Sequence, residues 1–533
     1  MDYLNHPFSS KRHTVFAKKG MVATSQPLAA QAGLEILKKG GNAIDAAIAT
    51  AAALTVLEPT SNGIGGDAFA LVWIKGELHG LNASGPSPEL LTAEAVKELG
   101  HEMMPKLGLI PITVPGAPAA WAELSEKFGR FPLEETLQPA IAYAEEGFPL
   151  TPILGKYWGK AFNAYKRLEG PEFTHWFETF APNGRAPEIG EIWSSQDHAD
   201  TLRAIAMSGA REFYEGELAQ KIENFMIEHG GFLRKSDLAA YQPEWVKPIS
   251  TNYRGYDVWE IPPNGQGIAA LMALNIFGQL DEPKWQNADT YHQQIEAMKL
   301  AFTDGQAFIT EQNDMPITVE HLLSKEYANV RAKEIHEQAI DPTPYELPKG
   351  GTVYLATADD EGNMVSYIQS NYMGFGSGIV IPGTGISLQN RGADFSLDES
   401  RPNFLKPGKR TFHTIIPGFL TKDGEAVGPF GVMGGYMQPQ GHFQVVSNTI
   451  DYSLNPQSAL DMPRWQWVGG KKVHVEPEFP NYLVQALQRK GHDIEVLPDG
   501  GSFGRGQIIW RNPKTGVLAG GTESRTDGMV AAW

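Results

Sequence analysis

A threonine that follows two glycines is the strongest candidate nucleophile in this sequence. Gly350 and Gly351 precede Thr352, which opens a run of β-branched and aromatic residues. A threonine hydroxyl needs a base, and a chain cut before Thr352 would supply one: the new α-amine, which titrates at about 7.7–8.0. The uncut chain has an amide at that position, so it would be an inactive precursor. On spacing alone, however, an ordinary strand start explains this threonine better.

A second candidate is Ser502, because residues 500–504 match the pattern GxSxG. A nucleophile elbow needs a strand before the serine and a helix after it. The following residues, RGQIIWRN, alternate as a strand does. We therefore predict a hairpin turn here.

Composition excludes several kinds of site. The chain has no cysteine, which rules out disulfides, thiolate zinc sites, iron–sulfur clusters and cysteine nucleophiles. It also lacks the HExxH and Walker motifs. We predict neither a metal nor an organic cofactor.

Charge and hydropathy bear on partners and location. The 533 residues carry a net charge of −18, so a nucleic-acid partner is not expected. The first twenty residues contain no apolar core of a signal peptide. The longest apolar stretch, residues 43–57, is rich in alanine and too short to span a bilayer. We predict a buried helix there, no membrane association and a cytoplasmic location.

The pattern of the chain predicts a mixture of helices and strands. Residues 118–245 and 265–340 are mainly helical in pattern, and residues 68–83 alternate like a hairpin that turns near Gly76. Residues 341–351, rich in proline and glycine, read as an exposed connector. A second hairpin is expected from Thr352 onwards, with TVYLATAD and MVSYIQS joined by DEGN. Further helices are expected at 440–450 and 481–491.

Several blocks in a fixed order give the chain a family resemblance. The blocks are MVATSQPLAAQAGLEILKKGGNAIDAAIA (21–49), PTSNGIGGDAF (59–69), TVPGAPAAW (113–121), YRGYDVWEIPPNGQG (253–267), GGTVYLATADDEGN (350–363), GFGSGI (374–379) and VMGGY (432–436). From about Gly20 to Thr526 the chain resembles the γ-glutamyltransferase (glutathione hydrolase) family of N-terminal-nucleophile hydrolases. It is most similar to a shorter, cytoplasmic, lid-less branch of uncertain substrate.

The resemblance implies an α+β fold, a four-layer αββα sandwich, and a precursor that cleaves itself. Residues 1–351 would form a large fragment and residues 352–533 a small one, intertwined in a single unit. Thr352 would first attack the carbonyl of Gly351. It would then attack the γ-amide of a glutathione-like substrate to form an acyl-enzyme, which water or an amine or peptide acceptor resolves.

The resemblance also assigns roles to individual residues. Gly434 and Gly435 match the glycines of the oxyanion hole, where backbone N–H groups would stabilise the tetrahedral intermediate. Ser370 matches a hydroxyl that hydrogen-bonds the nucleophile. Asp394 matches the carboxylate that holds the substrate α-ammonium.

The chain departs from the family where the substrate α-carboxylate should bind. Asn82 stands where the family has an arginine, and it offers neither charge nor a bidentate fork. The other binding positions are occupied by His413 and Thr414 in place of paired serines, by Arg391, and by Tyr372, beside Asn371, in place of an asparagine. Two explanations are open: either Arg391 binds the substrate carboxylate in place of the missing arginine, or the substrate is not an ordinary γ-glutamyl compound. His413 could add a pH-dependent donor.

Two enzymatic interpretations and one non-enzymatic interpretation remain. The first is a γ-glutamyl hydrolase or transferase, which the retained Asp394 favours. The second is an acylase of the glutaryl-cephalosporin type, whose acyl group lacks the α-amino group. The third is an unprocessed homologue without catalytic function.

Overall fold

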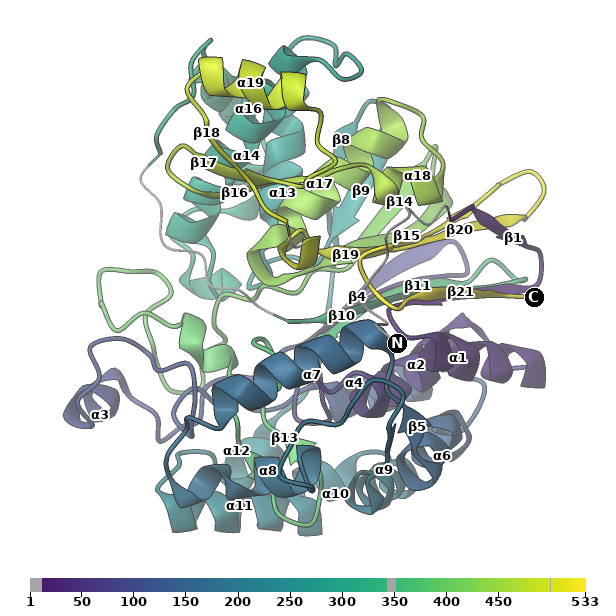
Figure 1. Cartoon of the computed structure of the whole chain (residues 1–533), viewed down its shortest axis with the longest axis vertical. Coiled ribbons are helices and arrows are strands. Elements are labelled where there is room, and N and C mark those ends of the chain that lie inside the picture. The colour runs from purple at the N-terminus through teal and green to yellow at the C-terminus, as the bar shows by residue number, and fades with distance from the viewer. Residues whose placement is uncertain (1–11, 343–350, 499) are drawn as a thin grey trace.

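The computed structural model describes residues 12–342, 351–498 and 500–533. In these residues two seven-stranded sheets lie face to face, each covered on its outer side by helices (Figure 1). The first, the β15 sheet, has the order β1 (Val15–Ala17), β20 (Leu518–Thr522), β19 (Arg505–Arg511), β15 (Glu425–Met433), β14 (Gly418–Lys422), β9 (Tyr256–Glu260), β8 (Ile249–Tyr253). The second, the β10 sheet, has the order β21 (Met529–Ala532), β2 (Gly20–Thr24), β10 (Val353–Asp359), β11 (Met364–Ser370), β3 (Asp67–Ile74), β4 (Glu77–Ala83), β7 (Glu244–Val246).

Strand β10 shows why the sheets stack. It is buried on both faces, and its side chains alternate between two cores. Val353 and Leu355 pack towards the helices, whereas Tyr354 and Ala356 pack between the two sheets. The middle layer of apolar side chains therefore holds the sheets together, which is the αββα sandwich that the family resemblance implies.

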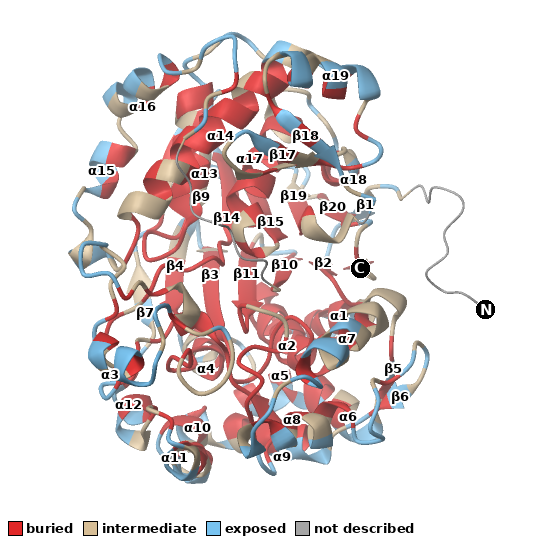
Figure 2. Ribbon diagram, turned by 60° about the vertical axis from the view of Figure 1, so that its left-hand side comes forward, coloured by how far each residue is buried: buried red, intermediate tan, exposed pale blue. Residues whose placement is uncertain are grey.

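Helices close both outer faces, and the most central ones are buried (Figure 2). The β10 sheet is covered by α1 (Pro27–Lys39) and the fully buried α2 (Ala43–Leu57), which Asn42 caps by accepting from two backbone N–H groups. Other helices on this side are α4 (Ala117–Phe128), α6 (Gln138–Glu146), α7 (Pro152–Tyr165), α9 (Gln196–Ser208) and α11 (Glu217–His229). On the other side lie α13 (Gly267–Phe277), α14 (Ala288–Phe308), α16 (Lys325–Ala332), α17 (Gln438–Ile450), α18 (Pro456–Asp461) and α19 (Asn481–Arg489).

Most predicted elements are present. Both hairpins form, β3–β4 and β10–β11, and helices lie at the predicted places near 440–450 and 481–491. The predicted connector falls largely on residues 343–350, and the start of the chain on residues 1–11, which are outside the described residues. No helix of the described chain is long and apolar enough to cross a membrane.

The predicted hairpin around Ser502 is wrong. The strand before it, β18 (Asp493–Val496), pairs in parallel with β17 (Lys472–Val475) in a small separate sheet that also holds β16 (Trp465–Gly469). The strand after it, β19, belongs to the β15 sheet, and Gly500–Ser502 form a short 3-10 turn between the two. Alternation after the turn identified a strand but not its partner.

Candidate active site

The β10–β11 hairpin sets Thr352 opposite Ser370. Val353 pairs with Gln369 across the two antiparallel strands, so the residues next outward face each other. The two side-chain oxygens lie 3.1 Å apart, and both hydroxyls donate to the carbonyl oxygen of Gly351, at 2.7 Å from Thr352 and 2.8 Å from Ser370. The hydroxyls of Thr352 and Ser370 therefore both contact the carbonyl of the peptide bond that precedes Thr352.

Neighbouring groups hold these hydroxyls in place. The Tyr372 N–H donates to Ser370 Oγ at 2.8 Å, which leaves the serine proton to point at Gly351. Gln438 Nε2, in the first turn of α17, lies 3.5 Å from Thr352 Oγ1. Thr352 itself is almost fully buried. Burial and these contacts fix the orientation of the Thr352 hydroxyl beside the Gly351 carbonyl.

Gly434 and Gly435 lie at the end of β15, directly before α17. Their φ angles are +140° and +58°, a region that strongly favours glycine. Gly434 and Gly351 line the same cavity, and Gly435 accepts from Gln266 Nε2 at 2.9 Å through its carbonyl. The turn therefore lies beside the reacting bond, and Gln266 fixes its orientation through the Gly435 carbonyl. An oxyanion hole needs backbone N–H donors, so the oxyanion role of the two glycines stays a prediction.

A second cluster, the acyl-side cluster, consists of Arg391, Asp394, Tyr372, Tyr436 and Thr414. Both tyrosine hydroxyls donate to Asp394 Oδ1, at 2.6 Å from Tyr372 and 3.1 Å from Tyr436. Arg391 Nη1 donates to Asp394 Oδ2 at 3.2 Å and to Thr414 Oγ1 at 2.9 Å. Arg391 and Asp394 come together on a short turn of 3-10 helix, Arg391–Asp394.

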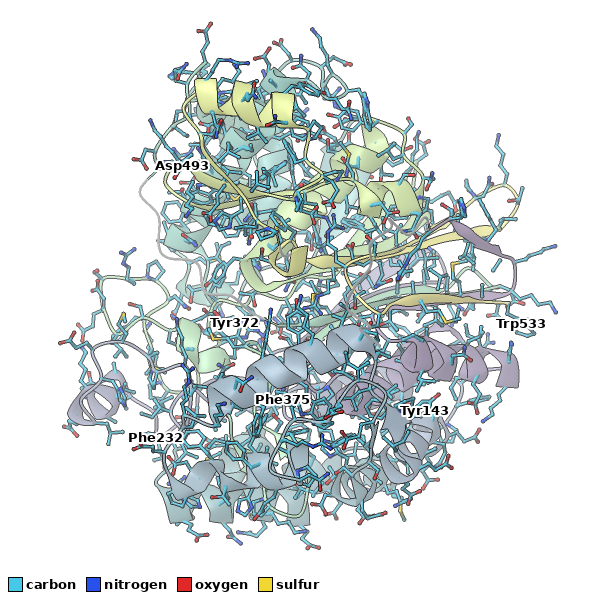
Figure 3. The ribbon with its side chains drawn as sticks, viewed as in Figure 1. Tyr143, Phe232, Tyr372, Phe375, Asp493 and Trp533 are labelled. Carbon is cyan, nitrogen blue, oxygen red and sulfur yellow. The ribbon has the colours of Figure 1, made fainter. Side chains whose placement is uncertain are left out.

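The guanidinium of this cluster is only partly satisfied. Arg391 is fully buried and lies 4.0 Å from the ring centre of Tyr372, yet its Nε and Nη2 have no hydrogen-bond partner. These two nitrogens form one edge of the guanidinium fork, the geometry that binds a carboxylate in bidentate fashion. Tyr372 has a φ of +74°, a strained conformation for a tyrosine. Figure 3 labels Tyr372 near the boundary between the upper and lower halves of the molecule.

Burial raises the pKa of Asp394 above its ordinary value, although Arg391 and the two tyrosine hydroxyls favour the carboxylate. Within the described residues, its Oδ2 accepts a hydrogen bond only from Arg391, and so retains capacity for a further donor. The cluster can therefore present a cationic fork and a carboxylate oxygen side by side.

His413 requires a correction. Its Nε2 lies 2.9 Å from Asp67 Oδ2, and its Nδ1 accepts from the N–H of Ile415 at 3.3 Å. Burial, and then the nearby Arg391, hold the pKa of His413 well below its ordinary value. With both nitrogens engaged and no charge at neutral pH, it does not suit the pH-dependent donor role that the sequence predicted.

Asn82 and Asn371 are placed differently from each other. Asn82 uses both ends of its amide, donating to Asn264 at 2.9 Å and accepting from the backbone and hydroxyl of Ser84. Asn371, by contrast, is buried with an unpartnered Oδ1. It packs against Gly63, where a Cβ would come within 2.9 Å of its amide, which explains a glycine of the 59–69 block.

Sequence reasoning missed Asp67 and Tyr436. Burial raises the pKa of Asp67 to about 7, although Arg391 and hydrogen bonds from Gln389 and Gly85 favour its carboxylate. Both residues lie inside the blocks that carry the family resemblance, Asp67 in 59–69 and Tyr436 in 432–436. Their place in these blocks was the signal that could have found them. A sequence pattern does not show, however, that Asp67 lies near Arg391 or that Tyr436 contacts Asp394.

Among the described residues, one group has the makings of a metal site: His292, Glu296 and His492, whose ligand atoms lie within 4.8 Å of one another. The two imidazoles are in hydrogen-bond contact at 2.8 Å, and Lys299 Nζ lies 2.7 Å from Glu296 Oε1. A buried ammonium thus already neutralises the only carboxylate of the group. The group therefore gives no reason to revise the prediction of an enzyme without metal.

Comparisons with known proteins agree with the geometry. The gamma-glutamyltranspeptidase family model matches residues 29–533. A crystal structure of cephalosporin acylase from Bacillus halodurans is 65% identical, with a TM-score of 0.97, and the match covers 99% of this chain and 98% of that one. The glutathione hydrolase-like YwrD proenzyme of Bacillus subtilis is 37% identical over 97% of this chain and 99% of its own length. The oxamate amidohydrolase proenzyme of Klebsiella pneumoniae is 34% identical over 96% and 98%. The resemblance found in the sequence is thereby confirmed: the chain is an enzyme of the gamma-glutamyltranspeptidase family.

Proposed function

We propose that the chain is the precursor of an N-terminal threonine amidase that acts on γ-glutamyl amides. Cleavage before Thr352 would give fragments 1–351 and 352–533, which share the β10 sheet: β2, β3, β4 and β7 come from the first, and β10, β11 and β21 from the second. The observation that carries the proposal is the pair of hydroxyls, Thr352 and Ser370, on the Gly351 carbonyl.

Cleavage follows from this arrangement. Thr352 Oγ1 attacks the Gly351 carbonyl carbon, the oxyanion is stabilised, and the C–N bond breaks as its nitrogen takes up a proton. Water then hydrolyses the resulting ester. The products are a carboxylate on Gly351 and a free α-amine on Thr352, which can act as the base for the next substrate. The same hydroxyl then attacks the substrate amide, and water or an amine acceptor resolves the acyl-enzyme.

The acyl-side cluster supports a substrate with a charged acyl group. The free Nε and Nη2 edge of Arg391 fits a carboxylate, and the open side of Asp394 Oδ2 fits an α-ammonium. Together they match the two charges of a γ-glutamyl group. In this proposal Arg391 replaces the arginine that the family has at the position of Asn82.

A second candidate is an acylase for glutaryl-type amides. Asp394 already accepts from two tyrosines and from Arg391, so an acyl group with a carboxylate but no ammonium would also fit. The high similarity to a cephalosporin acylase structure supports this candidate as well.

Intact mass under denaturing conditions tests the cleavage. The wild-type chain should give two fragments separated between Gly351 and Thr352. Thr352→Ala should remain a single chain without turnover, whereas Thr352→Ser, which keeps a hydroxyl, should still cleave. Cleavage of Thr352→Ala at the same bond would overturn the proposal. A wild-type chain that stays intact would favour the non-catalytic homologue.

Substrate choice is tested with γ-glutamyl- and glutaryl-p-nitroanilide, which differ only in the α-amino group. Turnover of the first with a higher kcat/KM supports the γ-glutamyl proposal, and turnover of the glutaryl compound alone supports the acylase. The cytoplasmic location stays a prediction, which fractionation of the source cells would test.

A further inference from the structure

A cavity of about 420 Å³ lies at the reacting bond. Gly351 and Gly434 line it, which ties it to the scissile carbonyl. Its lining does not include Arg391, Asp394 or Tyr372. Tyr436 borders both spaces, because it lines the cavity and also donates to Asp394.

This arrangement divides an amide substrate in two. The two substituents of a carbonyl carbon point in different directions, so an acyl group held by the acyl-side cluster leaves the amine half to the other space. The cavity meets this requirement, because it borders the Gly351 carbonyl and is lined by neither Arg391 nor Asp394. It would hold the amine leaving group before acylation and the acceptor amine afterwards.

Two cationic side chains, Lys160 and Arg505, line the cavity, and no described lining residue is acidic, whereas the whole chain carries a net charge of −18. His474 also lines the cavity, and its Nε2 lies 3.4 Å from Glu495 Oε2. A basic pocket in an acidic protein attracts anions selectively, because the field inside a cleft is set by its own walls. Val468, Leu497 and Pro498 add an apolar wall.

Arg505 is the most firmly positioned cation of this lining. It is the first residue of β19, is only 7% exposed, and lies opposite Met433 in the β15 strand that leads to Gly434. Its guanidinium lies over the ring of Tyr157, 4.6 Å from the centroid. Its Nε has no partner, and its Nη1 lies 3.6 Å from Glu58 Oε1, too far for a hydrogen bond.

Arg505 keeps one donor free beside its contact with Glu58. Burial raises the pKa of Glu58 to about 7, although Arg505 and a hydrogen bond from Ser25 favour the Glu58 carboxylate. The ion pair with Glu58 uses Nη1 and leaves Nε for a further acceptor. On the same wall, the hydroxyl of Ser502 is buried without a partner. A cationic donor and a free hydroxyl on one wall match the acceptor oxygens of a carboxylate.

We propose that this cavity is the amine-side subsite and that Arg505 selects amines that carry a carboxylate, such as an amino acid, a short peptide or a ring-bearing amino acid. The inference rests on the proposed function, since it assumes that Thr352 forms an acyl-enzyme. It adds the chemistry of the other half of the substrate.

The test compares two anilides that share one acyl group: γ-glutamyl-p-nitroanilide and γ-glutamyl-3-carboxy-4-nitroanilide, or their glutaryl counterparts if the enzyme prefers those. In Arg505→Gln, the ratio of kcat/KM for the carboxylated over the plain anilide should fall about tenfold relative to wild type, as expected for loss of one charge-assisted contact. Using the ratio cancels any general loss of activity. Arg511→Gln, the same substitution at the far end of β19, is the matched control and should leave the ratio unchanged.

The outcomes separate the two levels of the argument. If wild type cleaves itself and turns over both anilides, but Arg505→Gln and Arg511→Gln share the wild-type ratio, the subsite assignment is wrong and the proposed function stands. If wild type turns over neither acyl series, the proposed function itself fails. If Arg505→Gln misfolds, Ser502→Ala offers a second variant, whose ratio should fall in the same direction by a smaller factor. A Ser502→Ala ratio equal to that of wild type would then count against the assignment.

Discussion

Two buried groups of arginines and carboxylates in this molecule differ in how completely they are paired. The first group, the paired cluster, consists of Arg464, Arg525, Glu523 and Glu476. In it Arg464 and Arg525 share Glu523, and Arg525 also pairs with Glu476. Arg464 donates in addition to the carbonyls of Phe503 and Gly504. In the acyl-side cluster, Arg391 has one paired nitrogen and two unpaired ones.

The carboxylates of the two groups respond accordingly. Burial alone would raise the pKa of Glu523, but Arg464 and Arg525 outweigh it and lower that pKa to about 2. At Asp394 burial prevails, and its pKa is raised. Unpaired donors in a buried site cost stability, and each calls for an explanation such as a bound ligand or a water molecule. The first cluster is paired within the protein, whereas the second keeps the donors that the proposed substrate would use.

The largest expected effect is on the fully paired cluster. Glu523→Gln removes the charge that Arg464 and Arg525 share, and the free energy of unfolding should fall by about 3–5 kcal/mol, because a broken buried pair leaves uncompensated charge. Urea denaturation measures the loss. Glu361→Gln, which breaks the exposed ion pair with Arg130, is the control and should cost no more than about 1 kcal/mol. Equal losses would show that the buried cluster is not a stabilising one.

The dependence of stability on pH should separate the two regions next. Asp67 lies beside Arg391, and its pKa rises from an ordinary 3.8 to about 7 in the folded state. Between these values the folded state binds more protons, so this group lowers the free energy of unfolding as pH rises, by as much as about 4 kcal/mol. Glu523 acts in the opposite sense: its contribution is present above 4.5 and is lost as pH falls towards 2.

Melting temperatures from pH 4 to 8 for wild type and Asp67→Asn test this. Burial lowers the pKa of His413, so its contribution to stability changes with pH in the opposite sense, and the informative quantity is the difference between the two proteins. That difference should shift in favour of Asp67→Asn as pH rises. Parallel curves would mean that Asp67 keeps an ordinary pKa.

A smaller effect, on activity, is expected for Arg391→Lys. A lysine keeps the charge but loses the fork, so kcat/KM for the preferred anilide should fall by about 10- to 100-fold while self-cleavage persists. Arg464→Lys is the counterpart in the paired cluster: it should lower the melting temperature and leave kcat/KM of the folded enzyme close to that of wild type. A wild-type kcat/KM in Arg391→Lys would remove Arg391 from substrate binding.

The sequence predicted the elements better than the contacts between distant segments, and the role of Thr352 as nucleophile stays a prediction. The β10–β11 hairpin follows from alternation and a turn, and the opposition of Thr352 and Ser370 follows from its register. The turn at Ser502 was mispredicted because strand alternation carries no information about partner strands. His413 was given the wrong role because its partner, Asp67, lies 346 residues away along the chain. Residues separated by hundreds of positions meet through packing, which no local pattern records.

The smallest predicted effect concerns Tyr436, which borders both halves of the proposed substrate site. Tyr436→Phe removes one hydroxyl donor to Asp394 Oδ1 and leaves the donor from Tyr372. Loss of one hydrogen bond should lower kcat/KM for the γ-glutamyl anilide by about two- to tenfold. Because a donor that favours the carboxylate is lost, the pKa of Asp394 should rise further. The acid side of the kcat/KM profile should therefore move to higher pH for the γ-glutamyl anilide, whose ammonium needs the carboxylate, and stay in place for the glutaryl anilide. Equal shifts for both substrates would mean that Asp394 maintains the position of Arg391 and does not itself bind the substrate.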